Sequence, residues 1–341
     1  MISIAEAQGL ILAAVSPLTT EEAPLLAAFG RVVAEDLKAL WDIPLADYSA
    51  MDGYTFASSS GAVLQIDSFL PAGATRSIPV PPGSAVKIMT GAIIPPGCDT
   101  VVPIEDTEVH GERLLINSEV RAGLNIRLRG EDVIKGDLVI PAGTLLRPAE
   151  IGMLASLGRA AVTVVRRPKA AVLATGDELI EAGMEPAPGQ VVNSNSYSIS
   201  AHLLDSGADP LPLGIARDAR EVTLRKLEEG LAADLLITTG GVSVGDRDLV
   251  KELLVELGGE IKFWQVSMNP GKRPHLVRGA VELTGGRYRV ISTGNQSSGR
   301  ISSLTRSNGL MILAPNASLA AGEDVDVQLL DRSFEMGILT P

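Results

Sequence analysis

The sequence predicts a multidomain protein that joins an α/β domain with a parallel-type sheet to separate β-rich parts. The chain of 341 residues leaves room for about two to four domains. From residue 168 to 266, apolar strand-like runs alternate with amphipathic helical runs, which is typical of a wound α/β sheet. Residues 54–135 and the end of the chain instead carry short alternating runs bounded by Gly and Pro, which is typical of β-structure.

Composition and charge narrow the class of protein. Hydrophobic residues make up 45% of the chain, and no apolar run approaches the roughly 20 residues that span a bilayer, so we expect no membrane partner. The net charge of −12, without a basic stripe carrying aromatic residues, argues against a nucleic-acid partner. Residues 1–24 predict an amphipathic helix and an acidic turn rather than a signal peptide. With the single Cys98 excluding an internal disulfide, we expect a cytoplasmic protein.

The elements follow in order along the chain. After the first helix, residues 30–40 predict a strand or a short helix–strand passage. The segments AVLQI, SAVKIM, DTVVPIEDTEV and ERLLINSEV predict the strands of a small β-module. Residues 136–158 predict a strand, a turn and a helix that begins at Arg147-Pro148-Ala149-Glu150.

The sequence of the α/β region predicts four strands and three helices. The strand segments are KAAVLAT, ADPLPLGIA, DLLITTGG and EIKFWQV, and the helix segments are SNSYSISAHLLDSG, DAREVTLRKLEEGLAA and DRDLVKELLVELG. Their alternation predicts a parallel sheet with helices on both faces, hence three layers. The segments HLVRGAVEL, RYRVIST, LMILAP and EDVDVQLL predict a terminal β-domain.

Acidic residues follow three strands of the predicted parallel sheet. In such sheets ligands bind at the carboxyl ends of the strands. The loops that leave these ends carry Glu178, Asp218 and Asp248, with Asp177 and Asp246 beside them. One acidic residue at such a place is commonly only a helix N-cap. Three of them at one sheet edge favour a ligand site.

Two adjacent glycines, Gly240 and Gly241, lie at the same edge. Glycines let backbone N–H groups approach an anion, and the start of the following helix adds partial positive charge. The pair matches neither a P-loop nor a dinucleotide fingerprint. The carboxylates beside it suit Mg²⁺, which takes oxygen ligands and accompanies phosphate. The pattern therefore predicts an anionic substrate that binds together with Mg²⁺.

Three stretches in or beside the β-module leave two interpretations open. Asp52-Gly53 in DYSAMDGYTF could be only a hairpin or a hinge, and Thr90-Gly91 only a loop. The charges in NIRLRGEDV could form only a solvated cluster. Those charges are Arg127, Arg129, Glu131 and Asp132. Composition and spacing do not separate these interpretations from a functional role.

Six segments together make the chain resemble one family. They are SAMDGY, IMTGA, IRLRGED, ATGDEL, TTGGVSVGDRD and TGNQSSGRISSL, in this order. The chain resembles the molybdopterin molybdenumtransferases, the molybdenum insertases related to the C-terminal domain of gephyrin, from about residue 3 to about residue 335.

The resemblance implies an elongated homodimer with four domains per chain. Carried onto this chain, they are a linker domain (1–50 and 136–167), an inserted β-module (51–135), an α/β molybdopterin-binding domain (168–272) and a β-barrel-like C-terminal domain (273–341). The active site would lie between the α/β domain of one subunit and the β-module of the other. There, Mg²⁺-dependent cleavage of adenylylated molybdopterin, which releases AMP, would be coupled to insertion of molybdate.

The resemblance also assigns site residues. The catalytic residues would be Asp52, Thr90, Glu178, Asp218 and Asp248, and the substrate-binding residues Arg127, Asp132, Gly240, Gly241, Ser243, Lys272, Arg273 and Ser298. Asp218 and Asp248 would hold Mg²⁺ or position water, and Glu178 would orient the pterin or its phosphate. Arginine would pair with phosphate or oxyanion. Lys272, Arg273 and Ser298 would line the molybdate site.

The chain departs from the family pattern in two places. Asn269 stands where the family has a lysine, and the segment after Lys272 runs directly into the terminal β-domain. Several dozen residues of the family pattern are missing there, including a serine associated with molybdate. The departures favour an alternative, a non-catalytic molybdopterin-binding or scaffold paralogue. A third interpretation, a molybdopterin-binding module like that of molybdopterin adenylyltransferases and competence/damage-inducible proteins, leaves SAMDGY and IMTGA unexplained.

Overall fold

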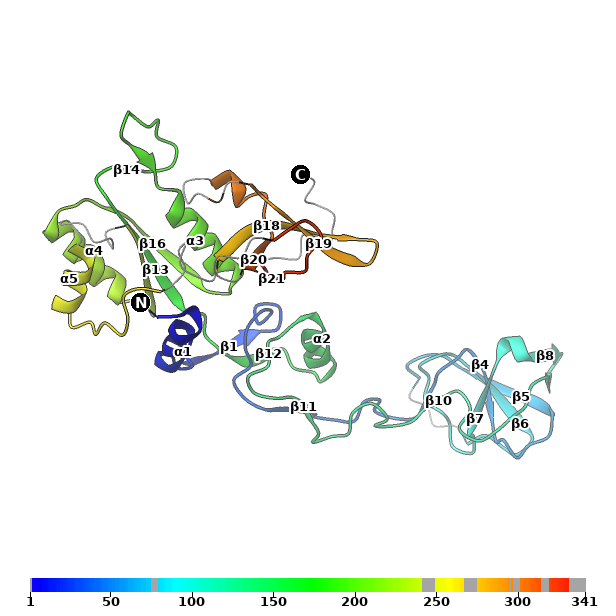
Figure 1. Cartoon of the computed structure of the whole chain (residues 1–341). Helices are drawn as coiled ribbons and strands as arrows, with labels where there is room; N and C mark the ends of the chain where they lie inside the picture. The colour runs from blue at the N-terminus through cyan, green and yellow to red at the C-terminus, as the bar shows by residue number, and fades with distance from the viewer. Residues whose placement is uncertain are drawn as a thin grey trace.

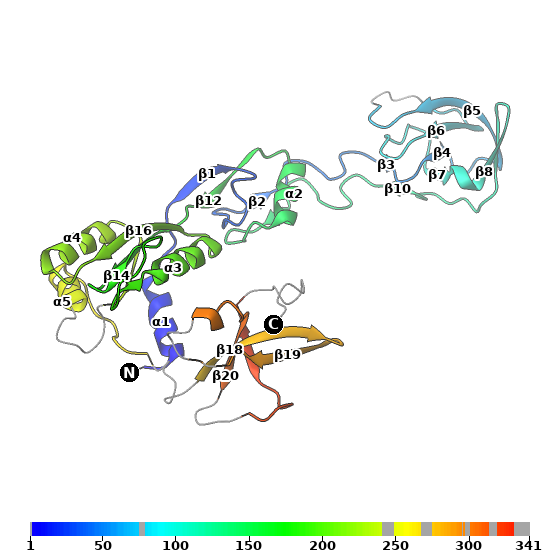
Figure 2. The ribbon, with the colours of Figure 1, turned by 90° about the horizontal axis from the view of Figure 1, so that it is seen from above.

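The computed structural model describes residues 2–74, 79–240, 249–266, 275–294, 296, 301–313 and 319–330. Over these residues the molecule is elongated (Figure 1). The α/β part and the C-terminal sheet lie at one end, and a six-stranded β-module lies at the other (Figures 1 and 2). A smaller middle part separates them. None of the described helices is long and apolar enough to cross a membrane.

The middle part is built from the two stretches of chain that flank the β-module. Strand β1 (Thr20–Pro24) pairs antiparallel with β12 (Ala161–Val165), and β2 (Leu37–Lys38) pairs with β11 (Leu138–Ile140). Helix α2 (Pro148–Ser156) begins as predicted, with Pro148 in its first turn and Glu150 completing a capping box. It adds Leu154 to a core shared with the strands.

The start of the chain corrects one expectation. Helix α1 (Ile4–Ala14) is present and begins with a capping box between Ser3 and Glu6. The predicted acidic turn after it is instead strand β1, whose carboxylates stay exposed while Ala23 enters the core. Because the partner strand β12 lies about 140 residues later in the sequence, local sequence gives no sign of this pairing.

The β-module is one curled sheet with the strand order β7-β4-β6-β5-β9-β8. These strands are β4 (Gly53–Phe56), β5 (Val63–Leu70), β6 (Ser84–Ile88), β7 (Thr100–Pro103), β8 (Thr107–His110) and β9 (Arg113–Ile116), with the short helix η1 (Ile104–Asp106) between β7 and β8. Apolar side chains alternate between its two faces: Ala85 joins one core and Val86 the other. Gly53 begins β4 and is not part of a two-residue hairpin.

The predicted α/β character of residues 169–256 is confirmed. Strand β13 (Lys169–Thr175) pairs in parallel with β16 (Asp209–Ala216) on one side and β17 (Leu235–Thr239) on the other. Its buried run occupies the middle of the sheet, as a run apolar on both faces requires. Helices α4 (Arg220–Leu231) and α5 (Leu249–Glu256) lie on one side and α3 (Ser194–Asp205) on the other (Figures 1 and 2).

Two features of this part differ from a plain wound sheet. The predicted fourth strand at residues 260–266 is wrong: Val266 makes only an isolated bridge to Ile2, whose N–H donates to the Gln265 carbonyl at 3.0 Å. The backbone of this segment is thus paired with the start of the chain rather than with the sheet. Between β13 and α3, the parallel strands β14 (Leu179–Ile180) and β15 (Val191–Val192) frame a projecting loop.

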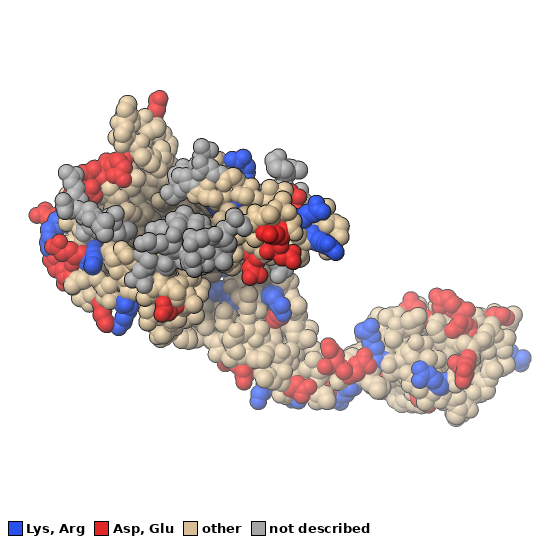
Figure 3. Space-filling view, viewed as in Figure 1, with Lys and Arg blue, Asp and Glu red and all other residues tan. Residues whose placement is uncertain are grey.

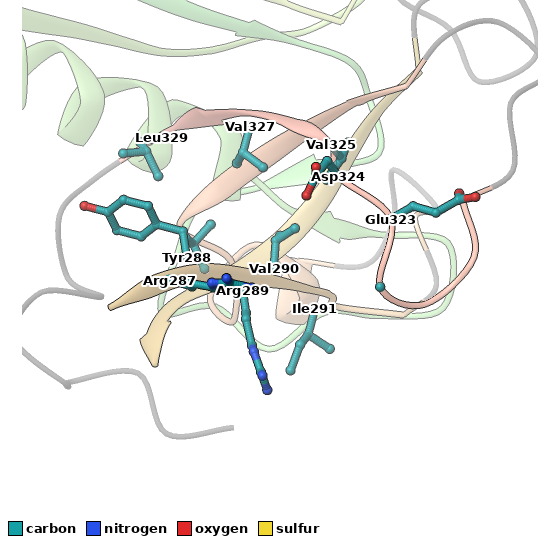
Figure 4. A pocket seen from close by; sticks show the side chains of 12 residues that line it. Arg287, Tyr288, Arg289, Val290, Ile291, Glu323, Asp324, Val325, Val327 and Leu329 are labelled. Carbon is teal, nitrogen blue, oxygen red and sulfur yellow. The ribbon is translucent and has the colours of Figure 1, made fainter. Parts of the chain in front are cut away.

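The C-terminal part is a curled antiparallel sheet with the order β19-β18-β20-β21. Its strands are β18 (His275–Thr284), β19 (Arg287–Ser292), β20 (Gly309–Leu313) and β21 (Asp326–Leu329), with the short helix η2 (Ile301–Ser303) before β20. A Cβ atom at Gly279 would lie 2.5 Å from the Val290 side chain, so glycine permits the tight curl. The edge strands β19 and β21 face each other across a hollow (Figure 4).

Candidate functional site

The predicted site residues fall into two groups that one chain keeps apart. Asp52, Thr90, Arg127 and Asp132 belong to the β-module and its connection, whereas Glu178, Asp218 and Gly240 belong to the α/β part. Figures 1 and 2 show these two parts at opposite ends of the molecule. The other predicted residues, Gly241, Ser243, Asp248, Lys272, Arg273 and Ser298, lie outside the described residues.

Asp52 and Thr90 form a direct contact in the β-module. The backbone N–H and the hydroxyl of Thr90 both donate to Oδ1 of Asp52 at 2.7 Å. These bonds, the backbone one first, lower the pKa of Asp52. Both residues are exposed, so an ionised carboxylate is available at the surface. The loop interpretation of Thr90-Gly91 is therefore incomplete, because the loop also fixes a carboxylate.

Short strands bring Arg127 to the same corner of the β-module. Strand β3 (Tyr48–Ser49) pairs with β10 (Ile126–Arg127), with Arg127 opposite Tyr48. The Gly91 N–H donates to the Ser49 carbonyl at 2.9 Å, which holds the Thr90 loop against β3. The exposed guanidinium of Arg127 makes no hydrogen bond or ion pair with another described residue. An exposed guanidinium of this kind can bind an anion.

Some charged side chains around Arg127 are bonded to other described residues, and others are not. Arg129 Nε donates to Asp42 Oδ2 at 2.5 Å, and the carboxylate of Glu131 accepts the Leu128 N–H at 2.8 Å. Both side chains are exposed but engaged, Arg129 with a carboxylate and Glu131 with a backbone N–H. Asp132 is exposed, and among the residues that the structure describes only its backbone N–H is bonded, to the Ile43 carbonyl at 3.1 Å.

At the other end of the molecule, the carboxyl ends of β13, β16 and β17 bring the second group together. The Gly176 N–H donates to the Ala216 carbonyl at 3.1 Å, and the Asp218 N–H donates to Asp177 Oδ1 at 3.0 Å. The loops after β13 and β16 are thus bonded directly to each other. The exposed carboxylates of Glu178 and Asp218 accept no hydrogen bond from other described residues, which leaves both available to a ligand.

Neither carboxylate is a helix cap. Helix α4 has Ala219 at its N-cap position and no side-chain cap, and the segment after Glu178 is strand β14 rather than a helix. The capping interpretation is therefore wrong for Asp218 and for Glu178. That these two carboxylates belong to a ligand site stays a prediction.

Arg217, which the sequence did not single out, and Asp177 hold this edge in shape. Nη1 of Arg217 donates to the carbonyls of Asp177 and Leu179, at 2.6 and 3.0 Å. Asp177 uses its own carboxylate to hold the Asp218 backbone. The only sign of Arg217 in the sequence is its position next to Asp218, because its acceptors lie about 40 residues earlier.

Gly240 is required by a close approach between two strands. Its φ of +83° is one that side chains rarely adopt, and a Cβ atom there would collide with the Thr175 carbonyl. The first glycine of the predicted pair thus lets β17 end tightly against β13. Its exposed backbone lies at the same edge as Glu178 and Asp218.

The described residues fit only part of the expected Mg²⁺ site. Carboxylate oxygen is the donor that Mg²⁺ takes, and Asp218 supplies it with a free carboxylate. Within the described part of the chain, however, no three His, Cys, Asp or Glu residues are grouped closely enough to hold a metal ion. The second expected ligand, Asp248, lies outside the described residues.

The surface charge and the hollow between β19 and β21 are two further features to set beside the predicted site residues. On the face drawn in Figure 3, acidic side chains gather around α4 and α5 and on the β-module, which fits the net charge of −12. The hollow between β19 and β21 is lined by residues such as Val281, Tyr288 and Leu329 and contains none of the predicted site residues that the structure describes.

Comparisons with known proteins match nearly the whole chain in two parts. Residues 2–158 match a family model described as the MoeA N-terminal region (domain I and II). Residues 171–324 match a model described as a probable molybdopterin binding domain.

Curated relatives match across both parts. A molybdopterin molybdenumtransferase of a Nostoc strain is 37% identical over 262 residues, which cover 74% of this chain and 60% of the relative. One of Haemophilus influenzae is 38% identical and covers 75% of this chain and 64% of the relative. The matched part of the chain therefore spans about three fifths of the length of these relatives.

Solved structures share the fold. A crystal structure of the molybdopterin biosynthesis moeA protein from Pyrococcus horikoshii OT3 is 28% identical with a TM-score of 0.79, and the match covers 96% of this chain and 100% of that chain. A second moeA structure from the same species, at 24% identity and a TM-score of 0.77, supports the fold alone. The two matched regions, the relatives and the shared fold place this chain in the MoeA family.

Proposed function

We propose that this chain is a molybdopterin molybdenumtransferase of molybdenum-cofactor biosynthesis. It would cleave adenylylated molybdopterin with release of AMP and insert molybdate into the dithiolene. The observation that carries the proposal is the sheet edge, where Glu178, Asp218 and Gly240 lie just after the carboxyl ends of three neighbouring parallel strands in a chain of the MoeA family. The free carboxylates and the close backbone approach suit an anionic substrate that binds with a cation.

Each group of residues has its own proposed part in binding. Asp218 would hold Mg²⁺ together with Asp248, and the bound ion would neutralise charge on the phosphoanhydride. Glu178 would orient the pterin end of the substrate, and the backbone at Gly240 would approach its phosphate. In the β-module, Arg127 would pair with phosphate or oxyanion, at the same corner as the Asp52 carboxylate, whose pKa is lowered by the Thr90 hydrogen bonds.

We further propose that the protein acts as a homodimer, in the cytoplasm. One chain holds its two groups of site residues at opposite ends, so a complete site needs a second copy. Large apolar side chains exposed on the middle part and on α1 support a covered surface there. Leu26 is 85% exposed and Leu12 is 71% exposed.

The function is tested by incubating the protein with adenylylated molybdopterin, Mg²⁺ and molybdate. We expect release of AMP and formation of active cofactor. Asp218→Ala should reduce the rate of AMP release by at least about 100-fold, because it removes a charged group at the reacting phosphate. Asp205→Asn, at the exposed end of α3, is the matched control and should leave the rate unchanged. Tight binding of substrate without turnover by the wild-type protein would contradict the proposal and favour the scaffold alternative.

A further inference from the structure

Two junctions connect the middle part to its neighbours, and the chain crosses each of them twice. The module junction is formed by residues 39–49 and 125–137. The α/β junction is formed by residues 15–20 and 165–169, with Asp234 from the loop before β17. In Figures 1 and 2 the β-module lies beyond the first junction and the α/β part beyond the second.

The module junction is a paired ribbon rather than two loose linkers. The Ile43 N–H donates to the Val133 carbonyl at 2.7 Å, and the Gly130 N–H donates to the Pro44 carbonyl at 3.0 Å. At its middle-part end, the Trp41 ring lies over Gly158, and its Nε1 donates to the Ser156 carbonyl at 3.2 Å. Backbone pairing therefore continues from the β-module to the middle part.

Asp42 ties the two strands of this ribbon through its side chain. Its Oδ1 accepts the Lys135 N–H at 2.8 Å, and its Oδ2 accepts Nε of Arg129 at 2.5 Å. The carboxylate is only 13% exposed. The Lys135 N–H first and Arg129 second lower the pKa of Asp42. One half-buried carboxylate thus fixes two points of the returning segment, six residues apart.

Asp234 makes the same kind of contact at the α/β junction. Its two oxygens accept Nη1 and Nη2 of Arg166 at 2.7 and 2.6 Å, and its Oδ2 also accepts the Lys169 N–H at 2.8 Å. Nε of Arg166 donates to the Thr19 hydroxyl at 3.0 Å on the other crossing segment. The paired, bidentate geometry restricts the angle between the segments more than a single bond would.

We propose that Asp42 and Asp234 are positioning residues. Each is the acceptor of a clamp, defined as one Asp carboxylate that binds an Arg side chain and a Lys backbone N–H across a junction. Together the two clamps set where the β-module lies relative to the α/β part. This proposal rests on the proposed function for its catalytic consequence, because a site shared between two copies needs both ends of each chain at fixed places. The corner with Asp52, Thr90 and Arg127 begins directly at the end of the ribbon.

The clamps are tested with Asp42→Asn and Asp234→Asn, which keep the side-chain size and remove the charge. We expect faster hydrogen exchange at the amides of Lys135 and Lys169, respectively, and a broader distribution of the maximum dimension in small-angle X-ray scattering. The kcat for AMP release should fall about tenfold, since small misplacement of reacting groups is costly. The KM should stay within about twofold, since the substrate contacts themselves are unchanged.

Matched variants separate the effect of losing a clamp from a general loss of protein stability. Glu256→Gln breaks an exposed ion pair with Arg220 within the α/β part and should change none of these quantities. Arg129→Lys keeps the charge at a single-bond contact and should retain most of the wild-type kcat. Arg166→Lys loses the bidentate pair with Asp234 and should lower the kcat. Unchanged exchange and scattering in both Asn variants would overturn the proposal. If the wild-type protein releases no AMP, the proposed function fails, while exchange and scattering still test the clamps.

Discussion

The carboxylates of this protein differ in the hydrogen bonds that their surroundings offer them. Asp52 is held by both donors of Thr90, Asp177 holds a neighbouring backbone, and Glu178 and Asp218 stay unbonded among the described residues. All four occupy conspicuous motifs in the sequence. Their roles differ because hydrogen-bond partners about 40 residues away decide which carboxylate is structural and which is available.

Replacing Thr90 by Val tests the environment of Asp52. The variant removes the hydroxyl donor and keeps the backbone N–H, which is the larger cause of the lowered pKa. We expect the pKa of Asp52 to rise but to stay below its ordinary value of about 3.9. A carbon-detected NMR titration of the Asp52 carboxyl measures this. Thr107→Val, whose hydroxyl donates to the Ile104 carbonyl, is the control and should leave that pKa unchanged.

The need for glycine at position 240 is tested by comparing its replacement by Ala with the same replacement at a glycine that has the same φ angle. Gly143 also has a φ of +83°, but a Cβ atom there would meet nothing within 4 Å. Gly143→Ala should therefore cost about 1–2 kcal/mol from the backbone angle alone. Gly240→Ala should cost more, because the Thr175 carbonyl must also move. Urea unfolding measures both, and equal costs would show that the β17 end can relax freely.

At the scale of elements, local sequence patterns predicted many helices and strands correctly. They failed where a backbone-pairing partner lies far away in the sequence. The run KAAVLAT was predicted as a buried strand, and β13 is one, because a strand covered on both faces is apolar throughout. The Arg147-Pro148 start of α2 was equally local. Strand β1 and residues 260–266 were assigned wrongly, since β12 and Ile2 supply their backbone partners from far along the chain.

The site residues themselves stay predictions, and the structure adds only the contacts around them. The motifs indicated Asp52, Thr90, Glu178 and Asp218. The bond from Thr90 to Asp52 and the bond from the Asp218 N–H to Asp177 were invisible in sequence. The cluster containing Arg127 and Arg129 could not be divided by spacing. Only the fold brings Asp42 to Arg129 across 87 residues and leaves Arg127 exposed. The domain boundaries remain predictions.

The start of α2 gives a prediction about pH. The Arg147 side chain lowers the pKa of Glu150 to about 2. A carboxyl whose folded pKa is depressed stabilises the fold above its unfolded pKa and loses this effect as pH falls through the folded value. Thermal melting should therefore move to lower temperature between about pH 4 and pH 2. Glu150→Gln should melt lower at pH 7 and show a smaller shift on acidification. An equal shift would contradict this source of acid sensitivity.

At the scale of the whole molecule, the elongated shape determines how a site can be completed. The β-module holds the corner with Asp52, Thr90 and Arg127 at one end, and the carboxyl edge of the parallel sheet lies at the other (Figure 1). No bending of one surface loop can join them, since the paired ribbon and the middle part intervene. The account therefore requires two copies for each reaction, with each chain contributing to both sites of a symmetric dimer.

Mixing two inactive variants tests this requirement most directly. Asp52→Ala disables the β-module group and Asp218→Ala disables the sheet edge, so each homodimer lacks both sites. After subunit exchange, verified by native mass, each mixed dimer has one site built only from unmutated groups. We predict recovery of AMP release to about one quarter of the wild-type rate, since half of the dimers are mixed and each has one working site of two. If the exchanged mixture stays as inactive as either variant alone, the two groups do not share a site between chains.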